Sequence, residues 1–267
     1  MGGKDLAEAL IELQDVTLSF GAKSVLKGVN LAVEQGETMV VIGPSGSGKS
    51  TILRLIIGLL KPTTGEISVH GETVSGYDEK AWNRLRKQMG MVFQYSALFD
   101  FMTVGENVAF GLRQHTQHTE EEIKARVAQV LDMVGLAGQE KVMPVNLSGG
   151  MKKRVSLARA IAVQPEIVLY DEPTAGLDPI MADVINELIV RTRDLLGVTS
   201  VVVTHDMDSA FRVADKIAML DGGKIIFVGT PETIRQTSDE RVRRFVYAGQ
   251  GKSAVQTIEG EQHESQQ

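Results

Sequence analysis

The segment Gly43-Pro-Ser-Gly-Ser-Gly-Lys-Ser50 constrains the fold of this chain more than any other stretch of its sequence. It follows the short apolar run Met39–Ile42, which is typical of a buried central strand, and it leads into Thr51–Leu60, which continues as a helix. A glycine-rich loop between a strand and a helix presents backbone N–H groups to a phosphate at the positive end of the helix dipole. The sequence therefore predicts an α/β fold that binds a phosphate group at this loop.

The residues of this loop have distinct expected contacts with a nucleotide. Lys49 is placed to reach the β and γ phosphates, Ser50 to hold Mg²⁺ and Thr51 to bond the α phosphate. An ordinary glycine-rich turn is the alternative interpretation, and the strand–loop–helix context argues against it. The predicted nucleotide contacts are Gly43, Pro44, Ser45, Gly46, Ser47, Gly48, Lys49, Ser50 and Thr51.

A second buried strand, Ile167–Tyr170, ends in the pair Asp171-Glu172. Ligands bind at the carboxyl ends of the strands in open α/β sheets, so this pair is expected beside the phosphate loop. Asp171 can hold Mg²⁺ through water, and Glu172 can polarise a water molecule that attacks a phosphate. An Asp-Glu pair that contacts only solvent is the alternative, which the presence of the phosphate loop disfavours.

The segment Leu147-Ser-Gly-Gly-Met151 opens a helix and forms a second candidate anion site. Because the chain already has one phosphate loop, this second site indicates that the ATP of another molecule is held by Ser148, Gly149 and Gly150. A serine N-cap followed by two flexible glycines is the alternative interpretation of this fragment alone.

The charge and hydropathy of the chain exclude other classes of protein. Among 267 residues, 28 Lys and Arg stand against 34 Asp and Glu, and this net charge of −6 argues against nonspecific nucleic-acid binding. The start of the chain lacks the apolar run of a signal peptide, and the longest apolar stretches are far short of the ~20 residues of a spanning helix. We expect that the chain does not cross a membrane by itself.

Two observations bear on metal and thiol chemistry. The chain has no cysteine, so disulfide scaffolds, cysteine zinc sites and thiol catalysis are ruled out. His115 and His118 have a spacing that suits one helix face, but they lie in a polar stretch without an evident third ligand. A solvated linker is therefore expected there rather than a metal site.

The remaining patterns predict strands at the start of the chain and helices in its middle. Ile11–Val33 largely alternates between apolar and polar residues, which indicates a half-buried antiparallel sheet. Thr103–Glu106 and Thr119–Glu122 are capping boxes that open two helices. Later in the chain, Gly222-Gly223 marks a hairpin, and Thr230-Pro231 opens what is expected to be the last helix.

These patterns divide the chain into three parts. Residues 1–94 and 164–247 are expected to form a nucleotide-binding core, and residues 95–163 a helical subdomain inserted into it. Residues 248–267 are polar and almost free of large apolar side chains, which predicts a flexible C-terminal tail.

The order and spacing of the motifs resemble those of the nucleotide-binding subunit of an ABC transporter. The phosphate loop is followed by Leu-Ser-Gly-Gly, by the strand that ends in Asp171-Glu172, by Ala175-Gly-Leu-Asp178 and by Thr204-His-Asp206. The likeness covers residues from about 10 to 246. It implies a P-loop NTPase with a RecA-like core, an antiparallel β subdomain and an inserted α-helical subdomain, and it implies ATP hydrolysis with Mg²⁺.

The resemblance also implies a role for each matching residue. Phe20 would stack on adenine, unless it is only a strand-end core aromatic, and Gln94 would touch Mg²⁺ and the attacking water. Asp178 would meet the partner subunit across a dimer, and His205 would contact the γ phosphate. The implied catalytic residues are Lys49, Gln94, Glu172 and His205, and the implied magnesium ligands are Ser50, Gln94 and Asp171.

The family mechanism implies partners as well. Two copies would sandwich two ATP molecules head to tail, with each site formed by the phosphate loop of one copy and Ser148–Gly150 of the other. ATP would close this homodimer, hydrolysis would open it, and a membrane permease would use the cycle for transport. The permease is expected in a groove near Tyr95, Leu98, Phe99 and Phe101, unless these side chains pack under their own helical insert. The subunit would lie peripherally on the cytoplasmic face of the inner membrane.

Four segments resemble, more narrowly, the ATPases of Mla/Mce-type lipid transporters of double-membraned bacteria. They are Ala97-Leu-Phe-Asp100, Glu106-Asn-Val-Ala-Phe110, Leu147–Met151 and Val242-Arg-Arg-Phe245. This likeness implies transport of phospholipids between the inner and outer membranes, with a permease and an Mce-domain lipid-binding protein as partners. An importer of small solutes, such as amino acids or metal chelates, would carry nearly the same motifs.

A non-transport ABC ATPase that acts on nucleic acid or the ribosome is a remote alternative. The DNA-repair type carries a long coiled coil between the two phosphate-binding motifs, and the segment between them is too short for one here. The translation type carries two ATPase domains, whereas this chain has a single phosphate loop. No nucleic-acid partner is therefore expected.

Met151 departs from the family pattern, which usually has glutamine at this position. The resemblance therefore implies one fewer amide contact toward the partner's nucleotide. Because Ser148 and the N–H groups of the two glycines remain, ATP binding is expected to survive.

Overall fold

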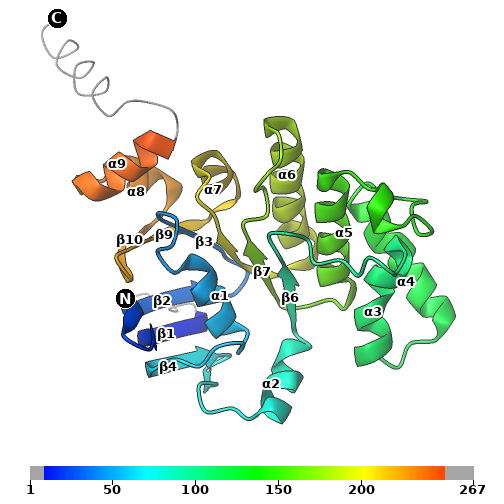
Figure 1. Cartoon of the computed structure of the whole chain (residues 1–267), viewed down its shortest axis with the longest axis horizontal. Coiled ribbons are helices and arrows are strands. Elements are labelled where there is room, and N and C mark those ends of the chain that lie inside the picture. Colours follow the sequence, from blue (N-terminus) through cyan, green and yellow to red (C-terminus); the bar gives the residue numbers. More distant parts are fainter. Residues whose placement is uncertain (1–8, 250–267) are drawn as a thin grey trace, which may run out of the picture.

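The computed structural model describes residues 9–249 and contains two β-sheets surrounded by helices (Figure 1). The larger sheet has six strands in the order β10-β9-β3-β8-β7-β6. Its neighbouring strands are parallel except for β9 and β10, which form the predicted hairpin at one edge. The carboxyl ends of the parallel strands therefore meet at one edge of the sheet. The strands are β3 (Thr38–Ile42), β6 (Met89–Val92), β7 (Ile167–Asp171), β8 (Thr199–Val203), β9 (Lys216–Asp221) and β10 (Lys224–Gly229).

The smaller sheet is antiparallel, as the alternating residues predict, and has the strand order β2-β1-β4-β5. The alternation is broken at Asp15, whose φ of 46° lies in the left-handed region. Asn30 holds this bulge, because its side chain accepts a hydrogen bond from the Asp15 N–H and donates one to the Asp15 carboxylate, each over 2.9 Å. The strands are β1 (Ala9–Phe20), β2 (Lys23–Glu34), β4 (Thr64–Val69) and β5 (Glu72–Thr73).

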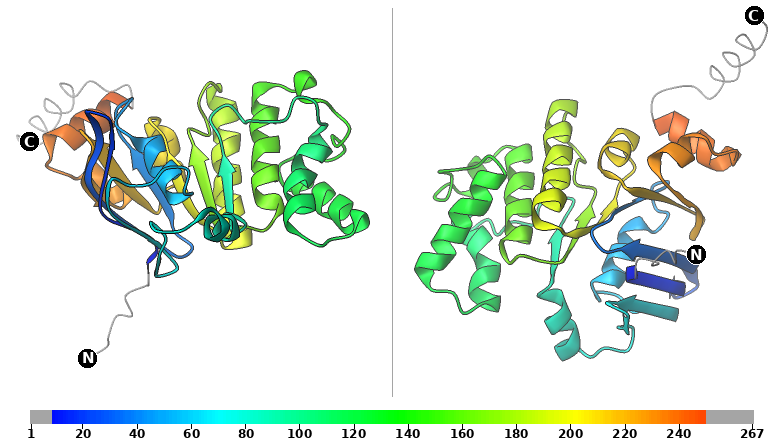
Figure 2. Two further views of the ribbon diagram at one scale, coloured as in Figure 1. Left: turned by 60° about the horizontal axis from the view of Figure 1, so that its bottom comes forward. Right: turned by 180° about the vertical axis from the view of Figure 1, so that it is seen from behind.

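The large sheet separates two hydrophobic cores. Along β3, Met39 and Val41 belong to the core shared with the small sheet and α1 (Lys49–Ile56), whereas Val40 and Ile42 belong to the core on the opposite face. Every residue of β3, β7 and β8 is buried, as expected for parallel strands covered on both faces. Figure 2 shows this layered arrangement from two further sides. The helices of the opposite face include α6 (Pro179–Leu196) and α7 (Met207–Val213).

The helical insert lies at the end of the molecule beyond β6 (Figure 1). Both predicted capping boxes are formed, at Thr103 with Glu106 and at Thr119 with Glu122. They open α3 and α4, which pack against each other and against α5. The elements of the insert are α3 (Val104–His115), α4 (Glu120–Met133), a 3₁₀ turn (Pro144–Asn146) and α5 (Gly149–Ala162).

The helix α5 connects this insert to the large sheet. It approaches β6 closely because Gly90 leaves room for it: a Cβ at Gly90 would stand 2.6 Å from the carbonyl oxygen of Ala160. Its C-terminal carbonyls, which have no partners within the helix, accept hydrogen bonds from Arg126 of α4 at Ile161 and Ala162, each over 2.9 Å. The helix is therefore held at both the sheet and the insert.

The first helix is shorter than its apolar pattern predicts. α1 ends at Ile56 rather than near Leu60, because Gly58 turns the chain with a φ of 71°. A helix that the patterns do not predict, α2 (Glu79–Arg86), covers this turn, and a Cβ at Gly58 would stand 2.3 Å from the indole of Trp82.

The C-terminal helices also differ from the prediction. α8 (Pro231–Arg235) is not the last helix, because α9 (Glu240–Gly249) follows it. Val242 and Val246 of α9 are buried, and the arginines around them obscure this narrow apolar face in the sequence. α9 includes the first residues of the predicted tail, and the rest of that prediction, 250–267, lies outside the described residues. No helix within residues 9–249 combines the length and apolarity needed to span a bilayer.

Candidate active site

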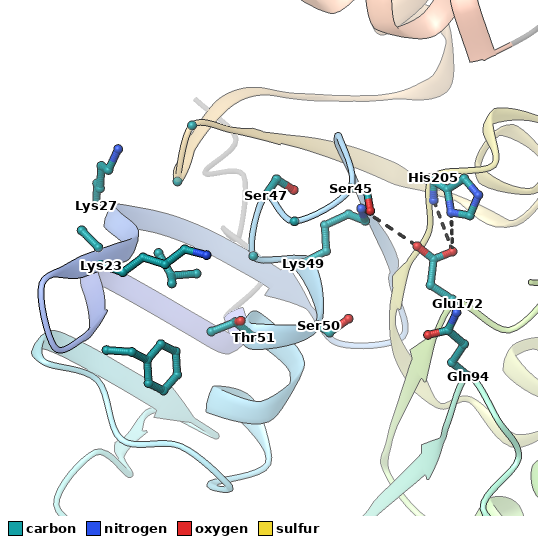
Figure 3. Close-up of a pocket in the computed structure, with 17 residues that line it drawn as sticks. Lys23, Lys27, Ser45, Ser47, Lys49, Ser50, Thr51, Gln94, Glu172 and His205 are labelled. Atoms are coloured by element: carbon teal, nitrogen blue, oxygen red, sulfur yellow. Dashed lines mark hydrogen bonds and ion pairs between the residues drawn. The ribbon is translucent and has the colours of Figure 1, made fainter.

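A cleft of about 650 Å³ opens where the phosphate loop, the small sheet and the carboxyl ends of the parallel strands meet (Figure 3). Figure 3 shows Lys49 and His205 directed toward the carboxylate of Glu172, with Gln94 beside it. Gln94, Glu172 and His205 follow β6, β7 and β8, which are neighbours in the large sheet. The cleft is lined by Phe20, Lys23, Ser24, Val25, Lys27, Ser45–Thr51, Gln94, Glu172, His205, Gly222 and Gly223.

The phosphate loop requires glycine at two positions. Gly43 has a φ of 150°, and a Cβ there would stand 2.1 Å from the carbonyl oxygen of Leu220 on β9. Gly48 has a φ of 107°, and its Cβ would stand 2.9 Å from the side chain of Leu26. Because Gly48 precedes α1 and offers no side-chain cap, the first N–H groups of this helix are left for an anion in the cleft.

Lys49 is the buried cation of the cleft, with 7% of its surface exposed. Its Nζ donates to the carbonyl oxygens of Gly43 at 2.8 Å and Pro44 at 3.2 Å, and it lies 4.0 Å from Glu172 Oε1. The carbonyl oxygens of Gly43 and Pro44 thus accept hydrogen bonds from Lys49. The other residues of the predicted loop, Ser45–Thr51, line the cleft. Burial lowers the pKa of the Lys49 ammonium, and the charges of Glu172 and Asp171 oppose that shift. Lys49 is therefore a desolvated donor that an anion can bind.

Ser50 and Asp171 offer two oxygen ligands to a cation. Ser50 Oγ donates a hydrogen bond of 2.7 Å to Asp171 Oδ1. A hydroxyl with one carboxylate is typical of protein sites for Mg²⁺, which completes its shell with phosphate oxygens and waters. Gln94 enters the cleft from the neighbouring strand end and can add an amide oxygen. These residues therefore fit a magnesium ion.

Glu172 has the geometry of a strained residue at a functional site. Its φ of 47° lies in the left-handed region, which costs a side-chain-bearing residue about 1–3 kcal/mol. Its backbone N–H donates to Val203 of β8 over 2.9 Å. Its Oε2 lies 2.9 Å from His205 Nδ1 and accepts a longer bond of 3.4 Å from the His205 backbone N–H. The backbone of β8 and its following loop thus fix the Glu172 carboxylate in the cleft.

A buried polar network adjoins this pair and connects it to the loop before α6. Ser209 of α7 is its centre: Ser209 Oγ donates to Asp206 Oδ2 over 2.5 Å, accepts from Asn186 Nδ2 over 2.9 Å, and lies 3.2 Å from Thr174 Oγ1. A hydroxyl has one proton and two lone pairs, so Thr174 must be the donor in the last contact. The loops that carry Glu172 and His205 are therefore tied to each other away from the cleft.

Ser148, Gly149 and Asp178 do not reach the cleft of their own chain. Ser148 Oγ accepts a hydrogen bond from the Met151 N–H over 3.3 Å and caps α5, and Asp178 caps α6 in the same way over 3.0 Å. All three are exposed, and Gly150 is buried beside Met181. The structure therefore brings the phosphate loop, Gln94, Asp171, Glu172 and His205 together, and leaves the predicted second anion site on another surface.

Three lysines near this site are not predicted from the sequence. Lys23 and Lys27 line the cleft from β2, beside Phe20, and carry no motif. Lys153 of α5 is 5% exposed and donates hydrogen bonds to the backbone carbonyls of Gln94 and Glu172 without lining the cleft. The signal for Lys153 is its position four residues before Leu157, on the buried face of α5.

The four residues of the predicted permease groove fall into two pairs. Tyr95 and Phe101 are 87% and 77% exposed. Leu98 and Phe99 instead pack against their own helical insert, where the Phe99 ring lies 4.9 Å from the ring of Phe110. The alternative interpretation thus holds for Leu98 and Phe99. The aromatic side chains of this region that remain exposed are Phe93, Tyr95, Phe101 and Phe110.

Asn107 of α3 holds the loop that presents this surface. Its side chain is fully buried, accepts a hydrogen bond from the Phe99 N–H and donates to the carbonyls of Phe99, Met102 and Thr103, at 2.8–3.1 Å. The amide has two N–H donors for three carbonyls, so one N–H is shared between two of them. The loop is therefore fixed by the helix that follows it.

The fold and the cleft define a nucleotide-binding ATPase of the ABC type, and residues 26–175 match the family described as ABC transporter. The chain belongs to this family and is one of its ATP-hydrolysing subunits. The predicted P-loop ABC ATPase fold is thereby confirmed.

Two relatives and one solved structure show which members of the family this chain resembles. The chain is 40% identical over 237 residues to the intermembrane phospholipid transport system ATP-binding protein MlaF of Escherichia coli K12, covering 89% of this chain and 88% of that protein. It is 40% identical over 245 residues to the methionine import ATP-binding protein MetN of Caulobacter vibrioides, covering 91% of this chain and 74% of that one. A dimeric ATP-binding cassette solved in a post-hydrolysis state with ADP and phosphate has a TM-score of 0.76 and 34% identity, over 83% of this chain and 98% of that chain.

Proposed function

We propose that this protein is the ATPase of a transporter that moves phospholipids between the inner and outer membranes of a bacterium. The observation that carries the proposal is the match to MlaF, which spans nearly the full length of both chains. The methionine importer has the same identity, but about a quarter of its length lies outside the match. An importer of small solutes is therefore the second candidate.

The separation of the two predicted anion sites supports a head-to-tail dimer. One chain supplies the cleft with Lys49 and Glu172, whereas Ser148 is exposed on another surface at the N-terminus of α5. A second copy of the chain can bring its Ser148–Gly150 segment and its Asp178 to the open side of the cleft. The similar cassette with ADP and phosphate is itself dimeric.

ATP would occupy the cleft with its phosphates at the loop and its base beside Phe20, which is 53% exposed and lines the open end. Lys49 would donate to the β and γ phosphates, and the N–H groups before α1 would bind their remaining oxygens. Ser50, Asp171 and Gln94 would hold Mg²⁺, which neutralises charge on the phosphates when it is bound.

Hydrolysis follows from the position of Glu172 at the γ-phosphate end of the cleft. Its carboxylate can accept a proton from a water molecule and orient that water toward the phosphorus. His205 contacts the Glu172 carboxylate through Nδ1, and its ring can turn its second nitrogen toward a γ phosphate. We therefore propose for Lys49, Gln94, Glu172 and His205 the roles that the family resemblance implies.

The permease would bind the surface formed by Tyr95, Phe101 and Phe110. Exposed aromatic side chains are typical of a docking surface, and Gln94 immediately precedes the loop that carries Tyr95 and Phe101. Movement of the loop would therefore reach the cleft through Gln94. This proposal places the subunit peripherally on the cytoplasmic face of the inner membrane, with an Mce-domain protein in the same assembly.

Affinity purification from detergent-solubilised membranes tests this assignment. We expect a permease, an Mce-domain protein and bound phospholipid to follow the tagged subunit in mass spectrometry. The double variant Tyr95→Ala/Phe101→Ala should lose the permease, whereas the control Leu59→Ala/Leu195→Ala, which removes similarly exposed side chains elsewhere, should keep it. A permease with a solute-binding protein and no lipid would establish the small-solute importer. Stoichiometric nucleic acid without a permease would establish the non-transport class.

The unusual Met151 gives a prediction about the second anion site. We expect Met151→Gln to leave ATPase activity within about tenfold of the unmodified protein, because one hydrogen bond is worth roughly 1 kcal/mol. Met151 packs partly against the helical core, and its backbone N–H already binds Ser148 Oγ. Steady-state ATP turnover is the measurement, and complete loss of activity in this variant would contradict the expectation.

A further inference from the structure

Lys153 is a buried cation that the proposed reaction does not use. It lies on α5 and is 5% exposed. Its ammonium donates one hydrogen bond to the backbone carbonyl of Gln94 and a second, of 3.3 Å, to the backbone carbonyl of Glu172. An ammonium group with three donors suits two carbonyl acceptors that lie close together. Lys153 therefore binds the peptides of two cleft residues without lining the cleft itself.

Lys153 donates to two peptide groups that lie at equivalent positions, just after the neighbouring strands β6 and β7. Val92 of β6 pairs with Tyr170 of β7, so Gln94 and Glu172 each follow this pair by the same distance along the chain. The peptide of Glu172 is also the strained one, with its N–H bound to Val203 and its carbonyl bound to Lys153. Removing Lys153 would free one of these two constraints and let the Glu172 carboxylate shift.

The charge of Lys153 also helps to hold its side chain beside Glu172. Burial lowers the pKa of its ammonium, and the nearby charges of Glu172 and Asp171 oppose that shift. These same charges attract the ammonium, so Lys153 is held at the peptides of Gln94 and Glu172 by charge as well as by hydrogen bonds.

The helix that carries Lys153 begins at the second anion site. Ser148 caps α5, and Lys153 follows about 7.5 Å further along the helix axis. α5 contacts the same loop again through Arg159, which donates to the carbonyls of Ser96 and Ala97 at 3.0 and 2.7 Å. A helix that is anchored at two points along one loop moves together with that loop.

We propose that Lys153 is a positioning residue that couples the two ATP sites of the dimer. In each copy, α5 presents Ser148 to the partner's nucleotide and, through Lys153, holds the peptide of that copy's own Glu172. The state of one site is thus transmitted along α5 to the catalytic carboxylate of the other. This inference rests on the proposed head-to-tail dimer.

Mixed dimers of the full chain separate this coupling from a purely local effect. Two differently tagged copies are purified together in the assembled transporter, and one copy carries Glu172→Gln, so that only the Glu172 of the other copy can hydrolyse ATP. Lys153→Met, which keeps the length of the side chain and removes its donors, is placed either in the copy with the intact Glu172 or in the copy with Glu172→Gln. The reference dimer carries Glu172→Gln alone.

Both placements are expected to lower turnover. With Lys153→Met in the copy whose Glu172 is intact, we expect a loss of about tenfold or more, because the carboxylate is misplaced. With Lys153→Met in the Glu172→Gln copy, the working site receives only Ser148 from the altered helix, and we expect a loss of about three- to thirtyfold. The Kd for ATP should change little in either dimer, because Lys153 does not line the cleft.

Turnover equal to the reference in the second placement would overturn the coupling, even if the first placement is impaired. If the wild-type chain forms no ATP-dependent dimer, the proposed function and this inference both fail, and the reference dimer reveals that case before Lys153 is altered. Lys153→Arg retains a cationic donor and should restore most of the turnover. A Lys153→Arg variant that folds normally but remains as slow as Lys153→Met would count against the hydrogen bonds.

Discussion

Replacing Glu172 by glutamine is expected to lower ATP turnover by about a hundredfold or more while ATP still binds. The amide has nearly the same shape as the carboxylate, but it cannot accept the proton of the attacking water. It also removes the negative charge of Glu172 beside Lys49, so that this carboxylate no longer competes with the γ phosphate for the Lys49 ammonium. The variant should therefore accumulate as an ATP-bound dimer.

Two measurements check this prediction. Single-turnover hydrolysis reports the chemical step, and size-exclusion chromatography in ATP and Mg²⁺ reports the dimer. Glu187→Gln is the matched control, because Glu187 is an exposed residue of α6 outside the cleft, and it should behave as the unmodified protein. Full turnover by Glu172→Gln would show that another group activates the water.

The second large effect is expected from Lys49→Ala, which should weaken ATP binding by about a hundredfold. Each charge-assisted hydrogen bond to a phosphate contributes about 1.5–3 kcal/mol, and Lys49 is placed to donate to two phosphates. The variant also frees the carbonyls of Gly43 and Pro44, which Lys49 now holds in the loop.

Thermal unfolding with and without ATP distinguishes lost binding from lost folding. Burial lowers the pKa of Lys49, so its charged form is disfavoured, and this cost offsets the two hydrogen bonds that Lys49 donates in the loop. We therefore expect the ATP-free variant to unfold near the temperature of the unmodified protein. The stabilisation by ATP should disappear, since it requires binding to the folded state. Lys61→Ala removes an exposed lysine and should keep the ATP-dependent shift. An unchanged shift in Lys49→Ala would refute the predicted phosphate contact.

The parts of the structure that follow local rules could be predicted from the sequence. The phosphate loop, the strand that ends at Asp171 and the capping box at Thr103 each depend on neighbours in the chain. Their residue types determine backbone conformation or burial directly. These elements also place most of the cleft, because parallel strands bring their carboxyl ends to one edge of the sheet.

Features that depend on distant contacts could not be predicted. The left-handed backbone of Glu172 is held by β8 and by Lys153, and no local pattern marks either contact. Every residue has a backbone carbonyl, so the residue type of the acceptor does not show which carbonyl a side chain will bind. For the same reason, the sequence places Tyr95, Leu98, Phe99 and Phe101 on one loop but does not show that Leu98 and Phe99 pack inward, where Asn107 binds the backbone of Phe99.

The buried side chain of Asn107 has a consequence for the thermodynamics of assembly. A flexible loop must lose conformational entropy when a partner binds it, and this loss subtracts from the affinity. Here the loop that carries Phe101 is ordered when the protein folds, because Asn107 already binds its backbone. A permease would therefore meet a preorganised surface, and the free energy of burying Tyr95 and Phe101 could contribute almost entirely to the strength of the complex.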